Sequence, residues 1–277
     1  VVTGVSGSGK TTLILESLVP ALAASTVGRS LPSHVKAVTA EGIEQVKLID
    51  ATPIGINVRS TVATYANVHD ELRKIFSHTQ DAKAHGYKAG DFSYNTGKLR
   101  CPVCDGTGVI SLDVQFLPDV EIVCPACRGS RYADTASHIH REGKDGSLLT
   151  LPQIMDMSVD EAIDVTLGLK KVQARLQTLH DLGLGYLTLG EPTPALSGGE
   201  AQRLKLASEM GRVQDDAVFV FDEPTIGLHP LDVQVLLNVF DGLVAKGATV
   251  IVIEHDLDLI RNADYVIDMG PGGGDAG

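Results

Sequence analysis

The chain has 277 residues, of which 43% are hydrophobic and 21% are charged, and this excludes a disordered or collagen-like protein. No run of about 18 apolar residues occurs, so the sequence predicts no transmembrane helix. Lys and Arg total 23 against 35 Asp and Glu, and the resulting net charge of −12 argues against a general nucleic-acid binder.

The charge is distributed unevenly along the chain. Residues 59–100 hold seven basic and four acidic side chains, whereas residues 200–277 hold five basic and fourteen acidic ones. We therefore expect the middle segment to be locally basic and able to contact DNA phosphates. An ordinary solvated face is the alternative interpretation of the same residues.

The first residues predict a buried strand that runs into a loop and then a helix. Residues 1–3 end the strand, and the helix begins at Thr11, with Pro20 as an early stop signal. The chain opens on this strand without Met or a signal peptide, so we expect a fragment whose upstream structure is missing. The lack of a secretory signal favours a reducing compartment, the cytoplasm.

Residues 4–11 match the phosphate-binding pattern G-x-x-x-x-G-K-[ST] between this strand and this helix. Glycines let backbone amides close around phosphate oxygens, Lys10 reaches the β- and γ-phosphates, and Thr11 can hold Mg²⁺. The motif predicts binding of ATP with Mg²⁺, and the alternative is a glycine-rich turn without a ligand. The expected nucleotide-binding residues are Gly4, Ser6, Gly7, Gly9, Lys10, Thr11 and Thr12.

The middle of the chain predicts fewer regular elements. Residues 35–40 and 46–50 are β-branched runs that predict two short strands. Residues 52–98 are polar and mixed. Ser158 with Glu161 forms a capping-box pattern that opens a helix containing Ile163, Leu167 and Leu169.

All four cysteines follow one pattern, C-x₂-C and C-x₂-C separated by nineteen residues. This spacing is typical of a structural Zn²⁺ site with four thiolates, and a closed Cys₄ site leaves no position for catalysis. Two disulfides are the alternative. The predicted ligands are Cys101, Cys104, Cys124 and Cys127.

The last third predicts a parallel α/β sheet, because three short apolar strands (217–221, 248–253 and 265–269) alternate with helical segments. Ligands of such sheets bind at the carboxyl ends of the strands. Asp222, after the first strand, would hold Mg²⁺, and Glu223 would orient the attacking water. His255, after the second strand, would contact the γ-phosphate or that water. Exposed acids and a structural histidine are the alternatives.

Residues 196–200 (LSGGE) precede an amphipathic helix, with Ser197 at its N-cap and two glycines that leave amides open to an anion. This pentapeptide resembles the signature of ABC-type ATPases, in which each nucleotide site combines one P-loop with the signature of an opposing cassette. A simple N-cap is the alternative.

A cassette interrupted by a cysteine-framed module resembles the UvrA family, the damage-recognition ATPases of bacterial nucleotide excision repair. The similarity covers nearly the whole chain. Several stretches look like the C-terminal ATPase half of that family: GVSGSGKTTL, IDATPIG, RSTVATY, GDFSYN, FLPDVEIVCPACRGSRY, LSGGEAQRLKLASE, FDEPTIGLHPLD and VIEHDLDLIRNADYVIDMGPGGGDAG.

The resemblance implies an ABC-type P-loop fold in four parts, with site residues in named roles. The parts are an ATP-binding core (1–50), a basic insertion with the zinc module (51–150), a helical signature subdomain (151–212) and the rest of the core (213–277). Ser197, Gly198 and Gly199 would contact nucleotide on the other cassette, Asp232 would be the D-loop residue, and His255 the switch histidine. Glu223 and His255 would be the catalytic pair. Implied partners are damaged double-stranded DNA, a UvrB-like helicase, a second cassette in the same protein and a second copy of it.

One position departs from the family pattern. Ala51 stands where the family usually has Gln in the segment after Asp50, and that Gln contacts Mg²⁺ or the attacking water. The change favours weaker hydrolysis, or a paralogue with a role in drug resistance or stress. A transporter ATPase subunit is the third hypothesis, and the zinc insertion argues against it.

The candidate DNA contacts are the segment 59–100 and two arginines of the second cysteine knuckle. Neutralising Arg100, Arg128 and Arg131 should weaken binding to damaged and intact duplex alike. In the alternative interpretation these arginines only pair with nearby acids such as Asp105 and Asp119.

Overall fold

The computed structural model describes residues 1–55, 57–112, 120–144, 146–210, 216–226, 228 and 230–272, and of residues 120 and 230–232 only the backbone. The chain forms two compact units. The core unit comprises Val1–Thr52 and Ser197–Gly277, and the helical unit comprises Pro53–Leu196. Each is described by itself below.

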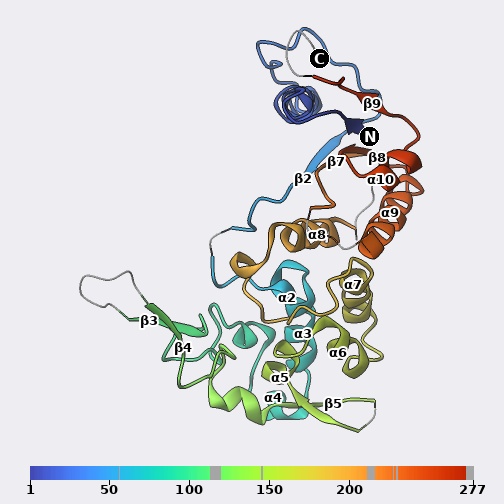
Figure 1. Ribbon diagram of the computed structural model, residues 1–277. Coiled ribbons are helices and arrows are strands. Elements are labelled where there is room, and N and C mark those ends of the chain that lie inside the picture. The colour runs from blue at the N-terminus through green and yellow to red at the C-terminus, as the bar shows by residue number, and fades with distance from the viewer. Residues whose placement is uncertain are drawn as a thin grey trace. The chain divides into compact units, whose positions relative to one another are not determined.

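The core unit is built on a five-stranded sheet in which every strand pair is parallel (Figure 1). The strand order is β2-β7-β8-β1-β9. In chain order the strands are β1 (Val2–Thr3), β2 (Gln45–Ile49), β7 (Ala217–Asp222), β8 (Thr249–Ile253) and β9 (Ile267–Asp268). The predicted parallel α/β sheet is confirmed.

Strand β7, which has a neighbour on each side, is apolar up to its last residue, Asp222, because both faces of the sheet are covered. Val218 and Val220 pack with Ile14, which follows the first loop of the chain, in one cluster. Phe221 points to the opposite face and meets Phe240 with ring centroids 4.6 Å apart. Alternate side chains of one strand therefore fill two separate layers of the core.

Helices η1 (Thr12–Leu18, a π-helix) and α1 (Val19–Thr26) follow β1, and α8 (Gly198–Glu209) precedes β7. In the chain, α9 (Pro230–Val244) lies between β7 and β8, and α10 (Leu257–Asn262) lies between β8 and β9. Both helices are drawn in red beside β8 in Figure 1. Pro20 does not end the helix. It stands in the first turn of α1, where its missing N–H breaks no α-helical hydrogen bond.

Two strand predictions need correction. Residues 35–40 form no strand, because no strand in the described part of the chain pairs with them, whereas β2 pairs with β7 over five residues. The predicted strand at 265–269 is shorter: only Ile267–Asp268 pairs with β1. Gly247, after α9, has a φ of 89°, a conformation that favours glycine beyond the end of a helix.

The helical unit contains α2 (Val62–Tyr65), α3 (Val68–Phe76), α4 (Gln80–Ala84), α5 (Leu151–Met155), α6 (Val159–Val165) and α7 (Lys170–Asp181). Three short 3₁₀ helices accompany them: η2 (Ala89–Phe92), η3 (Asp134–His138) and η4 (Thr193–Ala195). Two antiparallel hairpins complete the unit, β3 (Val109–Leu112) with β4 (Val120–Val123) and β5 (His140–Glu142) with β6 (Leu148–Thr150).

Part of this unit differs from the sequence-based expectation. Residues 52–98, expected to be irregular, contain α2, α3 and α4, and α3 buries Val68, Leu72 and Phe76 at four-residue spacing. The capping box of Ser158 and Glu161 is confirmed at the start of α6. This helix ends at Val165, before the leucines expected within it.

The expected four-part division stays a prediction, and the two compact units are coarser than it. The expected subdomain 151–212 contains α5, α6, α7 and α8. In the structure α8 lies in the core unit, whereas α5, α6 and α7 lie in the helical unit. Among the described helices, none has both the length and the apolar character needed to cross a membrane.

Candidate functional site

The loop between β1 and η1 has the backbone of a phosphate-binding loop. Gly4, Gly7 and Gly9 have φ values of 134°, 83° and 94°, a region that side chains with a Cβ rarely adopt. A Cβ on Gly4 would lie 2.9 Å from the Ser8 hydroxyl oxygen. The sequence therefore needs glycine at these positions for the loop to close.

The polar groups of this loop fit an anionic ligand. Lys10 is 6% exposed, and its Nζ donates to the carbonyl oxygens of Gly4 (2.8 Å) and Val5 (2.9 Å). The buried hydroxyl of Ser8 has no hydrogen-bond partner. An orphaned donor and a buried ammonium group beside a helix start are suited to phosphate oxygens. Ser6, Thr11 and Thr12 are exposed at the same place.

The sheet register brings residues from several strands to the same edge. Asp222, the last residue of β7, lies opposite Ile253 of β8, and Ile253 lies opposite Val2 of β1. The segments after these strands, which are the P-loop, the pair Asp222–Glu223 and the segment Glu254–His255, therefore follow the carboxyl ends of adjacent strands. This is the edge where parallel sheets bind ligands.

Acidic side chains gather at this edge. Burial raises the pKa of Asp222, and three neighbouring carboxylates add to this increase (Glu223, Asp50 and Glu254), whereas Lys10 opposes it. A bound cation stabilises the ionised form of clustered carboxylates with a raised pKa more than that of an isolated carboxylate. The donor set therefore fits Mg²⁺.

Glu223 and His255 face each other across the strand ends. Glu223 Oε1 lies 3.7 Å from His255 Nε2, and both side chains are roughly half-exposed. Glu223 has a φ of 45°, rare for a residue with a side chain, and its amide donates to the Ile253 carbonyl at 2.9 Å. Strain of this kind gathers at functional sites.

Ser197 is the N-cap of α8, as predicted, and it forms a capping box with Glu200. Ser197 and Gly198 are exposed, so the start of this helix is open to a ligand. A Cβ on Gly198 would lie 3.1 Å from the Cβ of Ala51, which places position 51 beside the first glycine of the signature. Asp232 falls in the first turn of α9, and its side chain lies outside the described residues.

Sequence reasoning missed two side chains that tie α8 to the sheet. Gln202 is 4% exposed and donates to the carbonyl oxygens of Ile49 (2.9 Å) and Asp222 (3.1 Å). Lys205 Nζ bonds Asp50 Oδ1 at 2.5 Å and Thr52 Oγ1 at 2.8 Å. A polar residue beside Ala201 on the apolar face of an amphipathic helix was the available signal for Gln202.

The four cysteines of the helical unit converge. All are buried, and their sulfur atoms lie within 4.8 Å of one another. Cys101 and Cys124 are 3.9 Å apart and Cys104 and Cys127 are 3.6 Å apart, so none is in a disulfide. A tetrahedral Zn–S site with bonds of about 2.3 Å has sulfurs roughly 3.8 Å apart. The geometry therefore fits zinc.

Backbone amides support these sulfurs. The amide of Gly108 donates to Cys104 Sγ at 3.3 Å. Burial opposes ionisation of the Cys104 thiol, but this amide and the thiols of Cys127 and Cys101 outweigh it and lower its pKa to about 7. A thiol that loses its proton readily is a good metal ligand.

The DNA role expected for Arg131 needs correction. Arg131 is buried, its guanidinium lies 5.3 Å from the ring centroid of Tyr94, and it donates to the Val58 carbonyl. Arg100 pairs with Asp105 at 3.1 Å, as the alternative interpretation predicts. Asp119 lies outside the described residues.

Some basic side chains of this region do remain exposed. Lys83 and Lys88, in and after α4, are exposed, and so is Arg128 of the second knuckle. Four others in the segment 59–100 pair with acids: Arg59, Arg73, Lys74 and Lys98.

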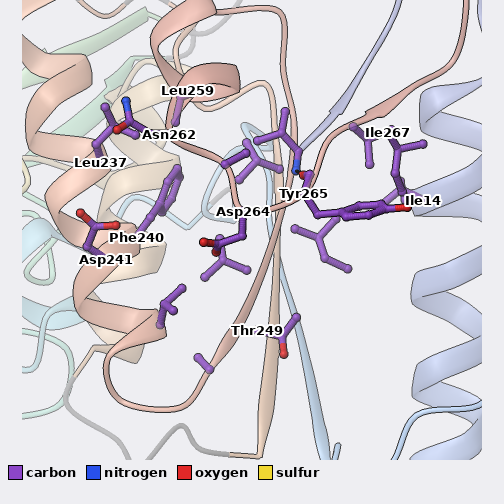
Figure 2. Close-up of a pocket in the computed structure, with 18 of the residues that line it drawn as sticks. Ile14, Leu237, Phe240, Asp241, Thr249, Leu259, Asn262, Asp264, Tyr265 and Ile267 are labelled. Atoms are coloured by element: carbon purple, nitrogen blue, oxygen red, sulfur yellow. Dashed lines mark hydrogen bonds between the residues drawn. The ribbon is translucent and has the colours of Figure 1, made fainter.

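A large cavity of the core unit lies away from the strand ends that carry these residues. It measures about 470 Å³ and is lined mostly by apolar side chains. Figure 2 shows Leu237 and Phe240 of α9 on one side of it and Ile14 of η1 on the other. Its lining includes Val1 and Thr249, at the amino ends of β1 and β8. It is therefore distinct from the phosphate loop and the acidic edge.

No protein-family model matches the chain. Among curated proteins, the UvrABC system protein A of Lactococcus lactis is 46% identical over 279 residues, which cover all of this chain and 29% of that protein. The Bacillus subtilis protein of the same name is 45% identical, with the same coverage. The chain thus spans less than a third of the length of these relatives.

The crystal structure of UvrA2 from Deinococcus radiodurans superimposes with a TM-score of 0.86 at 42% identity, over all of this chain and 33% of that one. This match confirms the expected fold, an ABC-type α/β ATPase with a mostly parallel sheet and an inserted module framed by four cysteines. Along its whole length, this chain is similar to one part of UvrABC system protein A, and the resemblance to the UvrA family is confirmed.

Proposed function

We propose that this chain is an ATP-hydrolysing cassette of a DNA-damage recognition protein in nucleotide excision repair. One observation carries the proposal: the phosphate loop, the acids Asp222 and Glu223, and His255 follow the carboxyl ends of adjacent parallel strands. Full-length similarity of the chain to a part of UvrABC system protein A supports the same function.

In this proposal each loop residue has a distinct task. Amides of the P-loop and Lys10 bind the β- and γ-phosphates of ATP, and Lys10 exchanges its carbonyl partners for phosphate oxygens. Thr11 and Asp222 hold Mg²⁺, which supplies positive charge to the phosphates when bound. Glu223 orients and polarises the attacking water, and His255 contacts the γ-phosphate or that water.

We propose that the signature, residues 196–200, completes a nucleotide site formed by two cassettes. Exposed Ser197 and Gly198, with Gly199, contact nucleotide bound to a second cassette, in the same protein or in a second copy. Asp232 is proposed as the D-loop residue between cassettes. ATP then holds two cassettes together, and hydrolysis releases them.

We propose that Cys101, Cys104, Cys124 and Cys127 bind one Zn²⁺. The ion closes two knuckles of the helical unit and has no role in hydrolysis, because four thiolates fill its coordination sphere. Free thiols in this arrangement fit a reducing compartment, the cytoplasm.

Damaged double-stranded DNA and a UvrB-like helicase are the proposed partners. With Arg131 buried, the proposed phosphate contacts are Lys83, Lys88 and Arg128. Contacts to phosphate are indifferent to sequence, so discrimination comes from the deformability of the damaged duplex.

A second function is favoured by Ala51. A paralogue that binds drug-modified DNA without full repair needs less hydrolysis, and Ala51 lacks the amide that the family usually has there. The transporter hypothesis gains no support from the relatives named above.

The test is equilibrium binding of damaged and intact duplex with ATP, measured over a range of salt concentrations. We expect the full-length protein to prefer the damaged duplex, and the double variant Lys83→Gln/Lys88→Gln to lower affinity for both and to reduce the salt slope by about 2.

The double variant Lys36→Gln/Lys246→Gln is the matched control, because it removes two exposed lysines from the core unit. Equal slopes in both double variants would move the DNA surface elsewhere. Absence of any preference for damage would favour the second function.

A further inference from the structure

Glu254 is a buried acid at the end of β8 to which no task is assigned above. It is 3% exposed and lies directly before His255. Its amide donates to the Val2 carbonyl at 3.1 Å, so the backbone is fixed to β1 as well as to β7 through the sheet. Buried carboxylates are rare unless each oxygen accepts hydrogen bonds.

Both carboxylate oxygens of Glu254 accept two hydrogen bonds each, from two different loops. Oε1 accepts from the amide of Thr225 at 2.9 Å and from the Thr225 hydroxyl. Oε2 accepts from the amides of His255 at 2.5 Å and Asp256 at 3.1 Å. One side chain therefore joins the turn after Glu223 to the turn that carries His255.

The position of Glu223 depends on this connection. Its φ of 45° is unfavourable, and the turn that follows is closed by the amide of Ile226 on the Glu223 carbonyl at 3.2 Å. Thr225 lies inside this turn and is held from outside by Glu254 Oε1. The other oxygen of the same carboxylate holds the turn that places His255 3.7 Å from Glu223.

We propose that Glu254 is a positioning residue that fixes the distance between Glu223 and His255 by binding both loops. The expected effect on hydrolysis rests on the proposed ATPase function. The hydrogen bonds by which Glu254 joins the two loops do not depend on that function. Glu254 acts through Thr225 and the amides of His255 and Asp256, and it transfers no proton. A side chain displaced by about 1 Å at a reacting centre can cost about 100-fold in rate.

The substitution Glu254→Gln separates this role from simple packing. Glutamine has the same shape, but its NH₂ group is a donor and would face two donors of one loop. One loop is then released while the core volume is unchanged. The milder variant Thr225→Val removes only the hydroxyl donor, so we expect a smaller effect of the same kind.

The first measurement is hydrogen exchange of the full-length protein, followed by mass spectrometry. In Glu254→Gln, amides in the peptides around Thr225 and around His255–Asp256 should exchange at least about tenfold faster. In Val252→Ala, which empties space at a buried position of the same strand, both peptides should keep parental exchange. Parental exchange of both peptides in Glu254→Gln would overturn the proposal.

The second measurement is steady-state ATP hydrolysis with an ATP-binding titration. Glu254→Gln should lower kcat roughly 10- to 100-fold while the Kd for ATP changes less than about threefold. Thr225→Val should fall between Glu254→Gln and the parent. Equal losses in kcat and ATP affinity, or a loss of kcat in Val252→Ala as large as in Glu254→Gln, would show a merely structural role.

The two measurements also separate this inference from the proposed function. A parental protein without ATPase activity would contradict the function, and faster exchange in Glu254→Gln would still support the bridge.

Discussion

Asp222 lies at the crowded acidic edge of the sheet, where its pKa is raised first by burial and then by neighbouring carboxylates. An acid whose folded-state pKa is raised stabilises the fold when protonated. This contribution is lost as pH rises through the folded-state pKa. Ionisation of this side chain therefore opposes folding of the nucleotide-free protein.

We expect Asp222→Asn to raise the melting temperature of the nucleotide-free protein at pH 7, because it removes this charge. The advantage over the parent should shrink as pH falls toward 3.8, the ordinary aspartate value. With Mg²⁺ and ATP the order should reverse, because the variant lacks a proposed Mg²⁺ ligand. Differential scanning fluorimetry over a pH series measures all three.

The matched control is Asp241→Asn, which removes an exposed charge on α9. If Asp222→Asn and Asp241→Asn shift the melting temperature alike, the electrostatic account of the acidic edge is wrong.

Individual residues were predictable where the chemistry lies within one short motif. Lys10 follows from eight contiguous residues, and Ser197 from the pentapeptide LSGGE. The contacts of Gln202 with Ile49 and of Glu254 with Thr225 were not predictable, since these partners come from other segments of the chain. Arg131 was predicted to face DNA because spacing alone does not reveal that its guanidinium lies over Tyr94 and bonds the Val58 carbonyl.

Helix α8 links the signature to the strand that carries Asp222. Gln202 →Leu should cost roughly 1–3 kcal/mol, because the buried carbonyls of Ile49 and Asp222 lose their donor. Urea denaturation followed by circular dichroism measures this change. Gln177→Leu on α7, where the amide bonds only exposed Asp181, should stay within about 0.5 kcal/mol of the parent.

The zinc module leads to a second prediction at the scale of structural elements. Replacing any one of the four cysteines with Ala should abolish stoichiometric zinc and loosen the module, because three thiolates leave the site open. Elemental analysis should find one zinc per chain in the parent and less than half of that in the variants. ATP affinity should be unchanged, since the P-loop belongs to the other compact unit.

The control for that experiment is Ser130→Ala, beside the second knuckle. If protein prepared under reducing conditions without chelator contained no zinc, the assignment of a zinc site would be contradicted.

Among the elements, strands were predictable to the extent that they are buried on both faces. β7 and β8 match their predicted ranges closely because continuous apolar runs mark a covered parallel strand. β9 is shorter than predicted, and residues 35–40 are not a strand, because pairing depends on a neighbour that composition does not reveal. α3 was missed, although its apolar residues recur every four positions.

At the scale of the whole molecule, charge is distributed unevenly along the chain, with a basic segment at residues 59–100 and an acidic C-terminal part. The acidic C-terminal part belongs to the core unit with the proposed Mg²⁺ ligands, and the exposed lysines Lys83 and Lys88 belong to the helical unit. Net charge alone therefore misjudges this chain, since −12 conceals a locally basic region. The composition could not show which of its basic residues pair with acids, as Arg100 does with Asp105.

The central claim is that ATP is hydrolysed at the carboxyl ends of β1, β7 and β8, with Glu223 as the residue that activates water. The most direct measurement is Mg²⁺-dependent ATP hydrolysis by the full-length protein, compared with ATP binding, for the parent, Glu223→Gln and Lys10→Ala. Glu223→Gln should lose about 100-fold or more in the hydrolysis rate assigned to this cassette and still bind ATP, whereas Lys10→Ala should lose binding. Hydrolysis at the parental rate in Glu223→Gln would contradict the account.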